Sequence, residues 1–190
     1  MNPYKDITNV EEKYYTDAQL ALQKSFIELN QHHEIFDISV KELCKNANVA
    51  RSTFYSYYNN INDLQEEIEN TLIYNLLKLN NDFVQNSILH EQDLEFLGNT
   101  RDYILDNKIT FYTFLITNPN IRFIKKWKKS IKYHFWENLF RNKTSINEKL
   151  ILELIAAQAI AAFIFWLENP KDIDFKGINK LIFQILNTFK

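Results

Sequence analysis

The sequence predicts an all-α protein, and three observations lead to this fold class. Its 190 residues contain only two glycines and three prolines, fewer than the turns of a sheet or barrel normally require. Apolar residues recur three and four positions apart, which is the spacing of an amphipathic helix. Capping residues stand directly before several of these stretches. Because 46% of the residues are hydrophobic, the chain can also form a proper core.

The first helix is predicted from Thr16 to about Asn30. Thr16 suits the N-cap position, because its hydroxyl can accept a hydrogen bond from a free backbone N–H of the first turn. The apolar residues that follow share one face at helical spacing; they are Ala18, Leu22, Phe26 and Leu29.

Two short helices follow and are separated by a tight turn. Ser39 precedes the second helix, with Glu42 three residues later, and this pair predicts a capping box. Asn48 stands where that helix ends, at a position that favours a left-handed backbone. The third helix is expected from about Ala50 to about Asn59. A longer helix followed by two short ones and a tight turn is the helix-turn-helix arrangement.

A long helix is then predicted from Asn62, with Gln65 three residues later as its capping partner. Its buried stripe consists of Leu64, Ile68, Leu72, Leu76 and Leu79. Further helices are expected at about 92–106, 108–117, 120–141, 146–168 and 175–189, with prolines in the breaks between them. We therefore expect a helix-turn-helix domain at 1–62 and a helical effector-binding and dimerisation domain at 63–190.

Composition also indicates where the protein works. The single cysteine, Cys44, excludes an intrachain disulfide framework and is typical of a reducing cytoplasm. The first residues contain no apolar run that resembles a signal peptide. One apolar segment, "LILELIAAQAIAAFIFWLEN" from Leu150, is nearly long enough for a membrane span, but Glu153 and Gln158 interrupt it. We interpret it as a buried or subunit-interface helix and expect a cytoplasmic protein without a membrane partner.

The third helix carries an unusual group of aromatic residues. Phe54 and Tyr58 are four residues apart and are expected to face the second helix. The side chains left on the outer face are Arg51, Ser52, Thr53, Tyr55, Ser56 and Tyr57. Hydroxyl groups bond phosphates without needing a positive charge, and arginine pairs with guanine edges, so this set suits the major groove of DNA. The alternative is a polar and aromatic helix face that only meets solvent.

The stretch "ISVKELCKNANVARSTFYSYYNNINDLQEEI" resembles the N-terminal DNA-binding domain of the tetracycline-repressor (TetR/AcrR) family of bacterial transcription regulators. The resemblance covers about residues 14–70. Ser39 matches the family's serine or threonine at the start of the second helix, whereas Asn48 replaces the usual turn glycine and Ala50 replaces a common capping serine. The aromatic pattern is retained in Thr53, Phe54, Tyr55, Tyr57 and Tyr58.

The resemblance implies a function and a set of contacts. It implies double-stranded DNA as partner, with base and phosphate contacts at Arg51, Ser52, Thr53, Tyr55, Ser56 and Tyr57 and a phosphate contact at Ser39. It also implies a ligand-responsive repressor that acts as a homodimer on a pseudo-palindromic operator. A transcriptional activator, or a protein-interaction module with weak or no DNA binding, is the alternative on the same fold.

Two departures from the family affect this expectation. Many members carry a phosphate-binding lysine just after the third helix, where this chain has Asn60 and Ile61. Residues 1–65 hold six basic and nine acidic side chains, a net charge of -3. We therefore expect weak non-specific attraction to DNA and a shallow dependence of binding on salt.

The second half of the chain is rich in aromatic residues, most of which belong to an ordinary core. Collectively they could line an apolar effector pocket between helices. The predicted pocket residues are Tyr103, Phe111, Trp127, Ile131 and Phe163, with Asn107, Tyr112 and Gln158 as polar neighbours. By family resemblance the last two predicted helices form the dimer interface, through Ala156, Ala157, Ile160, Ala161 and Ile164.

Two further patterns in the sequence concern partners and catalysis. Lys125, Lys128, Lys129 and Lys132 crowd the outer face of the helix predicted at 120–141, and this face is either solvated or a patch for an acidic partner or anionic effector. No catalytic constellation stands out, and the histidines lack the spacing that zinc sites favour. We therefore expect no enzyme activity, no metal and no cofactor.

Overall fold

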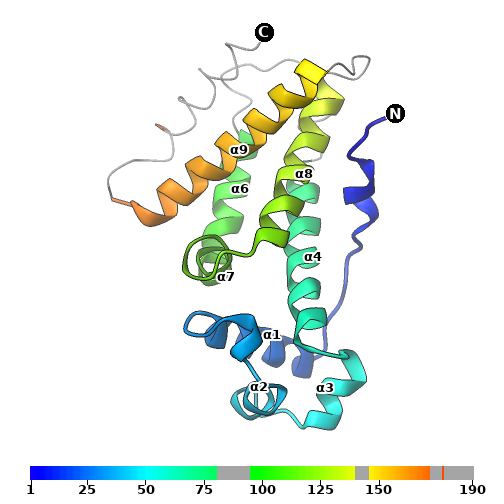
Figure 1. Ribbon diagram of the computed structural model, residues 1–190, viewed down its shortest axis with the longest axis vertical. Coiled ribbons are helices and arrows are strands. Elements are labelled where there is room, and N and C mark those ends of the chain that lie inside the picture. Colours follow the sequence, from blue (N-terminus) through cyan, green and yellow to red (C-terminus); the bar gives the residue numbers. More distant parts are fainter. Residues whose placement is uncertain (81–94, 140–145, 172–176, 178–190) are drawn as a thin grey trace. The chain divides into compact units, whose positions relative to one another are not determined.

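The computed structural model describes residues 1–80, 95–139, 146–171 and 177, and every regular element in these ranges is helical (Figure 1). The all-α prediction is confirmed. The elements are η1 (Lys5–Asn9), α1 (Asp17–Asn30), η2 (Ile35–Asp37), α2 (Val40–Asn46), α3 (Arg51–Tyr57), α4 (Ile61–Leu79), α6 (Glu95–Asp106), α7 (Lys108–Tyr112), a π-helical turn η4 (Thr113–Thr117), α8 (Ile121–Leu139) and α9 (Ile146–Glu168). The helix predicted at 175–189 lies outside the described residues.

The chain forms two compact units. The head unit comprises Val10–Tyr74 and Lys108–Asn120. The bundle unit comprises Met1–Asn9, Asn75–Asn107 and the described residues from Ile121 onward. The chain therefore passes from one unit to the other inside α4, between Tyr74 and Asn75, whereas the sequence placed a domain boundary at the start of that helix.

The head unit is built around α1, which packs against α2 and α3. Its core side chains are fully buried and come from four helices; they are Leu22, Phe26, Leu43, Phe54 and Leu64. Thr16 and Gln19 form a capping box at the start of α1, because the Thr16 hydroxyl accepts from the Gln19 backbone and the Gln19 side chain accepts from the Thr16 backbone. The predicted first helix and its cap are confirmed.

The segment Lys108–Asn120 joins the head unit although it lies between two helices of the bundle unit in sequence. The Asn118 side chain donates to the carbonyl oxygens of Asn30 and His33, at the end of α1. The side chain of Asn120 donates to the buried carboxylate of Glu69 on α4, with a nitrogen–oxygen distance of 2.8 Å. These two side-chain amides supply hydrogen bonds to carbonyl and carboxylate oxygens, and leaving such oxygens without a partner inside the protein would cost free energy.

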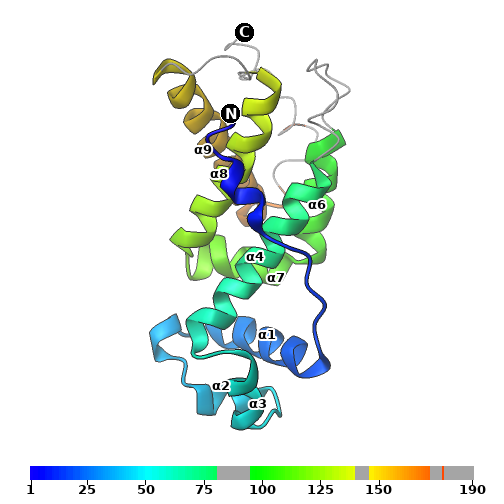
Figure 2. The same cartoon turned by 90° about the vertical axis from the view of Figure 1, so that its right-hand side faces the viewer.

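In the bundle unit, α8 and α9 pack along each other (Figure 2). The rings of Trp127 on α8 and Phe163 on α9 lie 5.5 Å apart between centroids, and both side chains are buried. Of the helices in the described part of the chain, one, Asn147–Glu168, is long and apolar enough to cross a membrane by length and composition. Because it packs on α8, we interpret it as a bundle helix, as the sequence indicated.

Candidate nucleic-acid interface

The turn between α2 and α3 positions the third helix. Asn48 adopts the left-handed conformation, with φ of 52°, as the sequence predicted. Its backbone N–H donates to the Lys45 carbonyl at 3.3 Å, and the N–H of Val49 donates to the Cys44 carbonyl at 2.9 Å. These two bonds are those of a Schellman motif, which ends α2 and turns the chain sharply. α3 can therefore begin only a few residues after α2 ends.

The inner side of the third helix faces the head-unit core. Phe54 and Tyr58 are both buried, as predicted, but Tyr58 follows the helix in an extended conformation. Its hydroxyl donates to Oε1 of Glu67 on α4, at 2.5 Å. Burial, together with this carboxylate, raises the pKa of the Tyr58 hydroxyl. The tyrosine therefore stays protonated and fixes the end of α3 to α4.

The outer side of α3 is open to solvent. Arg51, Ser52 and Ser56 are exposed, Thr53 is half-buried, and Tyr55 and Tyr57 are 51% and 42% exposed. The Ser56 hydroxyl donates to the Thr53 carbonyl, and the Tyr57 hydroxyl accepts from the Thr16 hydroxyl at 3.3 Å. The six side chains that the sequence assigned to the outer face therefore lie on one short helix, and one of them, Tyr55, also packs edge-on against the Phe54 ring, with 5.3 Å between ring centroids.

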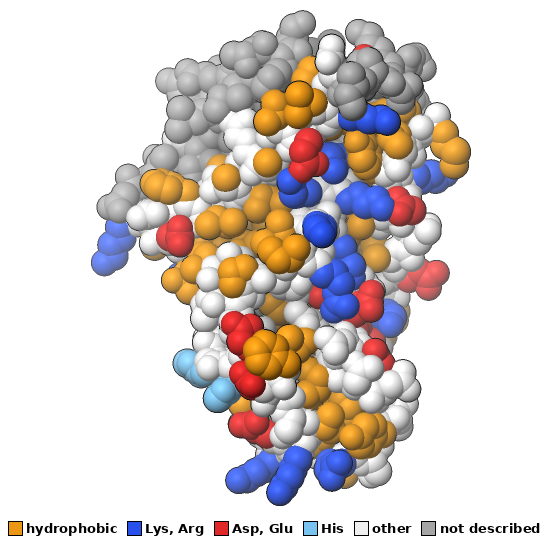
Figure 3. Space-filling view, in the orientation of Figure 1, with side chains coloured by type: hydrophobic (Ala, Val, Ile, Leu, Met, Phe, Trp, Pro, Cys, Tyr) orange, Lys and Arg blue, Asp and Glu red, His pale blue; other side chains and the backbone are white. Residues whose placement is uncertain are grey.

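Ser39 begins α2 and is exposed. Its hydroxyl oxygen accepts from the backbone N–H of Glu42 at 3.1 Å, so the serine half of the predicted capping box is formed. The serine retains its own proton as a donor. Basic side chains gather where α2 and α3 lie (Figure 3). The exposed basic residues of these two helices are Lys41, Lys45 and Arg51.

The cap of α4 differs from the sequence-based expectation. Its N-cap is Asn60 rather than Asn62: the Asn60 side-chain oxygen accepts from the Asp63 backbone N–H at 3.2 Å. Asn60 also donates to Asp63 Oδ1 at 3.1 Å, while the backbone and side chain of Asn59 donate to Oδ2 at 3.0 and 2.8 Å. The bonds from Asn59, then those from Asn60, hold the pKa of Asp63 below its usual range. Asn60, at the position where the resemblance leads to an expected lysine, is thus a helix cap.

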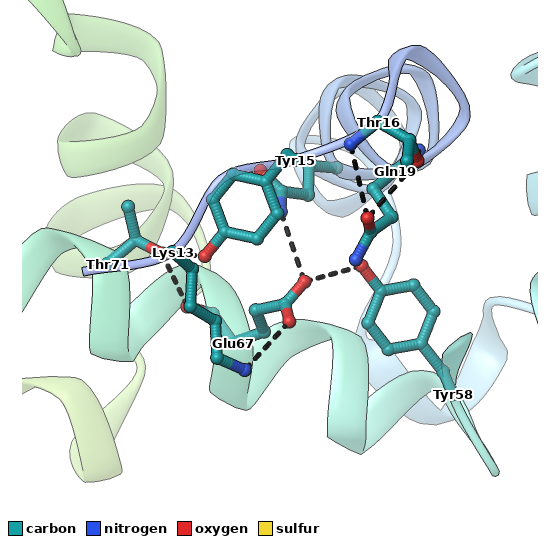
Figure 4. Close-up of polar contacts among 8 residues, drawn as sticks. Lys13, Tyr15, Thr16, Gln19, Tyr58, Glu67 and Thr71 are labelled. Atoms are coloured by element: carbon teal, nitrogen blue, oxygen red, sulfur yellow. Dashed lines mark hydrogen bonds and ion pairs between the residues drawn. The ribbon is translucent and has the colours of Figure 1, made fainter. Parts of the chain in front are cut away.

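Glu67 on α4 was not foreseen, and it collects contacts from three parts of the head unit (Figure 4). Besides Tyr58, it pairs with Lys13 at 3.1 Å and accepts from the Gln23 side chain on α1 at 3.3 Å. One turn further along α4, Thr71 shares a 2.5 Å hydrogen bond with the Tyr15 hydroxyl. These partners are far apart in sequence, so no local pattern could have identified them.

The predicted effector-pocket residues fall in both compact units. Phe111 and Tyr112 belong to the head unit, and the other six belong to the bundle unit. Trp127 and Phe163 meet, as described above, and Tyr103 accepts a 3.0 Å hydrogen bond from Asn75 on α4. The remaining members are half-buried: Asn107, Ile131 and Gln158. The effector pocket stays a prediction, and six of its eight predicted residues belong to the bundle unit.

The predicted interface residues of α9 lie on different sides of that helix. Ala156 and Ile160 are buried within the bundle, Ala157 and Ala161 are exposed, and Ile164 is half-buried. Leu150, Leu154 and Phe165 lie outside the predicted set and are 57%, 47% and 51% exposed. The exposed residues follow one another at spacings of three and four and form a continuous apolar stripe; we call Leu150, Leu154, Ala157, Ala161 and Phe165 the α9 stripe. Orange side chains lie over this helix in Figure 3.

Among the residues that the structure describes, no three His, Cys, Asp or Glu side chains gather in a group that could hold a metal ion. The buried thiol of Cys44 has its pKa raised by desolvation, the opposite of what a reactive cysteine requires. The outer face of α3 is therefore the best-defined candidate site of the described chain.

No protein-family model and no curated protein matches this chain. Solved structures do match it. A TetR transcriptional regulator from Streptococcus agalactiae 2603V is 22% identical, with a TM-score of 0.68 over 89% of this chain and 93% of that one. The dihydroxyacetone kinase operon activator DhaS is 21% identical, with a TM-score of 0.53 over 90% and 93%.

A TetR-family regulator from Streptomyces coelicolor is 14% identical, with a TM-score of 0.55 over 93% of this chain and 80% of that one. Each likeness covers 89% or more of this chain. At these identities a likeness of structure establishes the fold and not the ligand or the operator. The chain has the fold of the TetR-family transcriptional regulators.

Proposed function

We propose that this protein is a TetR-family transcriptional regulator that binds double-stranded DNA through the outer face of α3. The observation that carries the proposal is the separation of its aromatic residues: Phe54 and Tyr58 are buried while Tyr55 and Tyr57 are exposed beside Arg51. Tyr55 packs edge-on against Phe54 and Tyr57 accepts a hydrogen bond from Thr16, but the two side chains stay 51% and 42% exposed, so much of each remains available to a partner. A face that enters a major groove gains hydroxyl and guanidinium contacts to phosphates and base edges.

The regulator is proposed to be a cytoplasmic homodimer. The α9 stripe supports this, because five neighbouring apolar side chains on one helix face favour contact with a second copy over water. Two-fold symmetry would place the two α3 helices about one turn of DNA apart, roughly 34–36 Å, on a pseudo-palindromic operator. DNA binding is assigned to residues 1–62, and effector binding and dimerisation to 63–190.

We further propose that a small-molecule effector controls this binding and that the protein represses its target genes. The aromatic core of the bundle unit supports an apolar effector. Activation is the second candidate, because the structurally similar DhaS is an operon activator. A reporter gene behind the bound promoter separates the two: loss of the regulator raises expression for a repressor and lowers it for an activator.

The proposal is tested with the intergenic DNA beside the protein's own gene, by fluorescence anisotropy at low salt. Arg51→Ala and Tyr55→Ala should abolish specific binding. Tyr55→Phe removes one hydroxyl from each subunit and should weaken binding of the dimer by about 10–100-fold, the effect of two hydrogen bonds. Phe36→Ala is the matched control, since Phe36 is an 82% exposed aromatic of the same unit that lies on η2, and it should bind like the wild type.

The contrary results are equally definite. Wild-type affinity for both Tyr55→Phe and Arg51→Ala would remove α3 from the interface. Failure of the wild-type protein to bind any duplex, including the most enriched sequences from a randomised pool, would favour the protein-interaction module instead.

A further inference from the structure

The first nine residues lie on the bundle unit, not with α1 (Figure 2). η1 packs against α8, and two side chains of this segment, Asn2 and Ile7, are buried. Ile7 supplies an apolar anchor, while its neighbours remain in water. We call Met1–Asn9 the strap.

Polar contacts hold the strap along one side of α8. The Asn2 side chain donates to the Tyr133 carbonyl at 3.1 Å and to Glu137 Oε1 at 2.8 Å. Asp6 forms an ion pair with Lys129, and the ammonium of Lys132 lies 5.1 Å from the centre of the Tyr4 ring. A buried amide without hydrogen-bond partners would be costly, so the two bonds of Asn2 favour this one position of the strap on α8.

These contacts also explain the lysine-rich face of α8. Lys128 and Lys132 both pair with Glu153 on α9, and Lys129 pairs with Asp6 of the strap. Of the four lysines predicted to crowd this face, three thus meet acids of the same unit. The two lysines lower the pKa of Glu153, Lys128 having the larger effect. The acidic partner that the sequence suggested is, in this structure, the chain itself.

Beyond the strap, the chain enters the head unit at Val10 and is fixed again within a few residues. Lys13 pairs with Glu67, and Tyr15 shares its hydrogen bond with Thr71, both on α4. Thr16 then caps α1. The linker between the last buried strap residue, Ile7, and the first of these contacts is short, and an extended chain spans at most about 3.5 Å per residue.

We propose that the strap is a tether that limits how far its anchors on the bundle unit and the head unit can separate, and that this limit favours DNA binding. One end is anchored on α8 and the other on α4 and α1, so the short linker limits how far these anchors can separate. Only the effect on DNA binding rests on the proposed function; the restraint itself does not. Releasing the tether lowers the fraction of molecules that are ready to bind, and apparent affinity falls by the same factor.

The test slackens the tether without removing any contact. A flexible insertion of about eight Gly and Ser residues between Val10 and Glu11 leaves the strap and the Lys13 and Tyr15 contacts in place. The matched control places the same insertion between Met1 and Asn2, where it adds length outside the tether. Two further variants undock the strap: deletion of Asn2–Asn9, and Ile7→Asp.

The first readout needs no DNA. Nitroxide labels at Lys24→Cys on α1 and Lys125→Cys on α8, diluted with unlabelled subunits, report the distance between the units by double electron–electron resonance. Both native positions are exposed, and the single native cysteine is buried. The linker insertion and both undocking variants should broaden the distance distribution, while the control insertion leaves it unchanged.

The second readout is affinity for the intergenic DNA beside the gene, where the linker insertion should weaken binding by about five-fold at unchanged thermal stability. A linker insertion with wild-type distances and wild-type affinity overturns the tether, whatever the undocking variants do, because the strap would then only help α8 to fold. Broadened distances in a protein that binds no DNA retain the tether and reject the proposed function.

Discussion

Asn60 lies in the short connection between α3, the proposed DNA-binding helix, and α4. Its side chain caps α4 and, with Asn59, surrounds the carboxylate of Asp63 with hydrogen bonds. Tyr58, two residues earlier, is fixed to Glu67. The connection from α3 to α4 is therefore held at both ends, and a lysine at position 60 would remove this structural cap.

We predict that Asn60→Ala lowers the free energy of unfolding by about 1 kcal/mol, the usual cost of losing an N-cap. Asn60→Ser keeps a capping oxygen and should lose at most a few tenths of that amount. Urea denaturation of the two variants and the wild type measures the difference. Equal stability of the alanine and serine variants would show that the Asn60 side chain does not act as a cap.

Single residues differ in how far their roles could be predicted. Asn48 could be assigned because a left-handed residue after a short helix is a local requirement, and few side chains other than glycine tolerate it. The cap of α4 could not, because Asn59, Asn60 and Asn62 are equally good capping residues within one turn. The choice among them depends on where Tyr58 is anchored, and Glu67 is distant in sequence.

At the scale of elements, α9 shows the limit of helical periodicity. Its bounds, Ile146–Glu168, were predicted correctly, because polar residues precede the helix and Pro170 follows it. The helix is apolar on all sides, however, so spacing alone could not say which side meets α8 and which side is exposed. α3 is the opposite case, since its alternation of polar and aromatic residues identified its inner side in advance.

The α9 stripe leads to a prediction about assembly. Leu154→Glu places a carboxylate in the middle of the stripe, and burying it against a second copy would be costly without a partner. We expect the dissociation constant of the dimer to rise by about 100-fold or more. Lys149→Glu, also exposed on α9, is the control for added negative charge and should leave assembly unchanged.

Sedimentation equilibrium measures this directly, since the chain has a mass of 22.8 kDa. A Leu154→Glu protein that stays dimeric at the wild-type concentration would place the interface elsewhere. A monomeric wild type would reject the homodimer itself.

At the scale of the whole molecule, charge separates this protein from a typical DNA-binding chain. Its net charge is -2, and the negative balance of residues 1–65 extends to the part that is proposed to meet DNA. Several charges are also used internally: Lys13 is paired with Glu67, and lysines of α8 are paired with Glu153 and Asp6. Affinity for DNA therefore has to come mainly from hydrogen bonds and shape rather than from released counterions.

The salt dependence of binding tests this balance. The exposed basic side chains of α2 and α3 are Lys41, Lys45 and Arg51, three in each subunit and six in a dimer. If every one of them neutralised a phosphate, the slope of log K against log salt would be about -5, because each contact contributes about -0.9. We expect a slope no steeper than this, measured by anisotropy between about 50 and 200 mM KCl. Lys41→Gln removes one contact from each subunit and should reduce the slope by about 2 without changing which sequence is preferred, since a phosphate contact carries no base information. A wild-type slope near -10 would mean that other basic residues reach the DNA and that the local charge deficit does not govern binding.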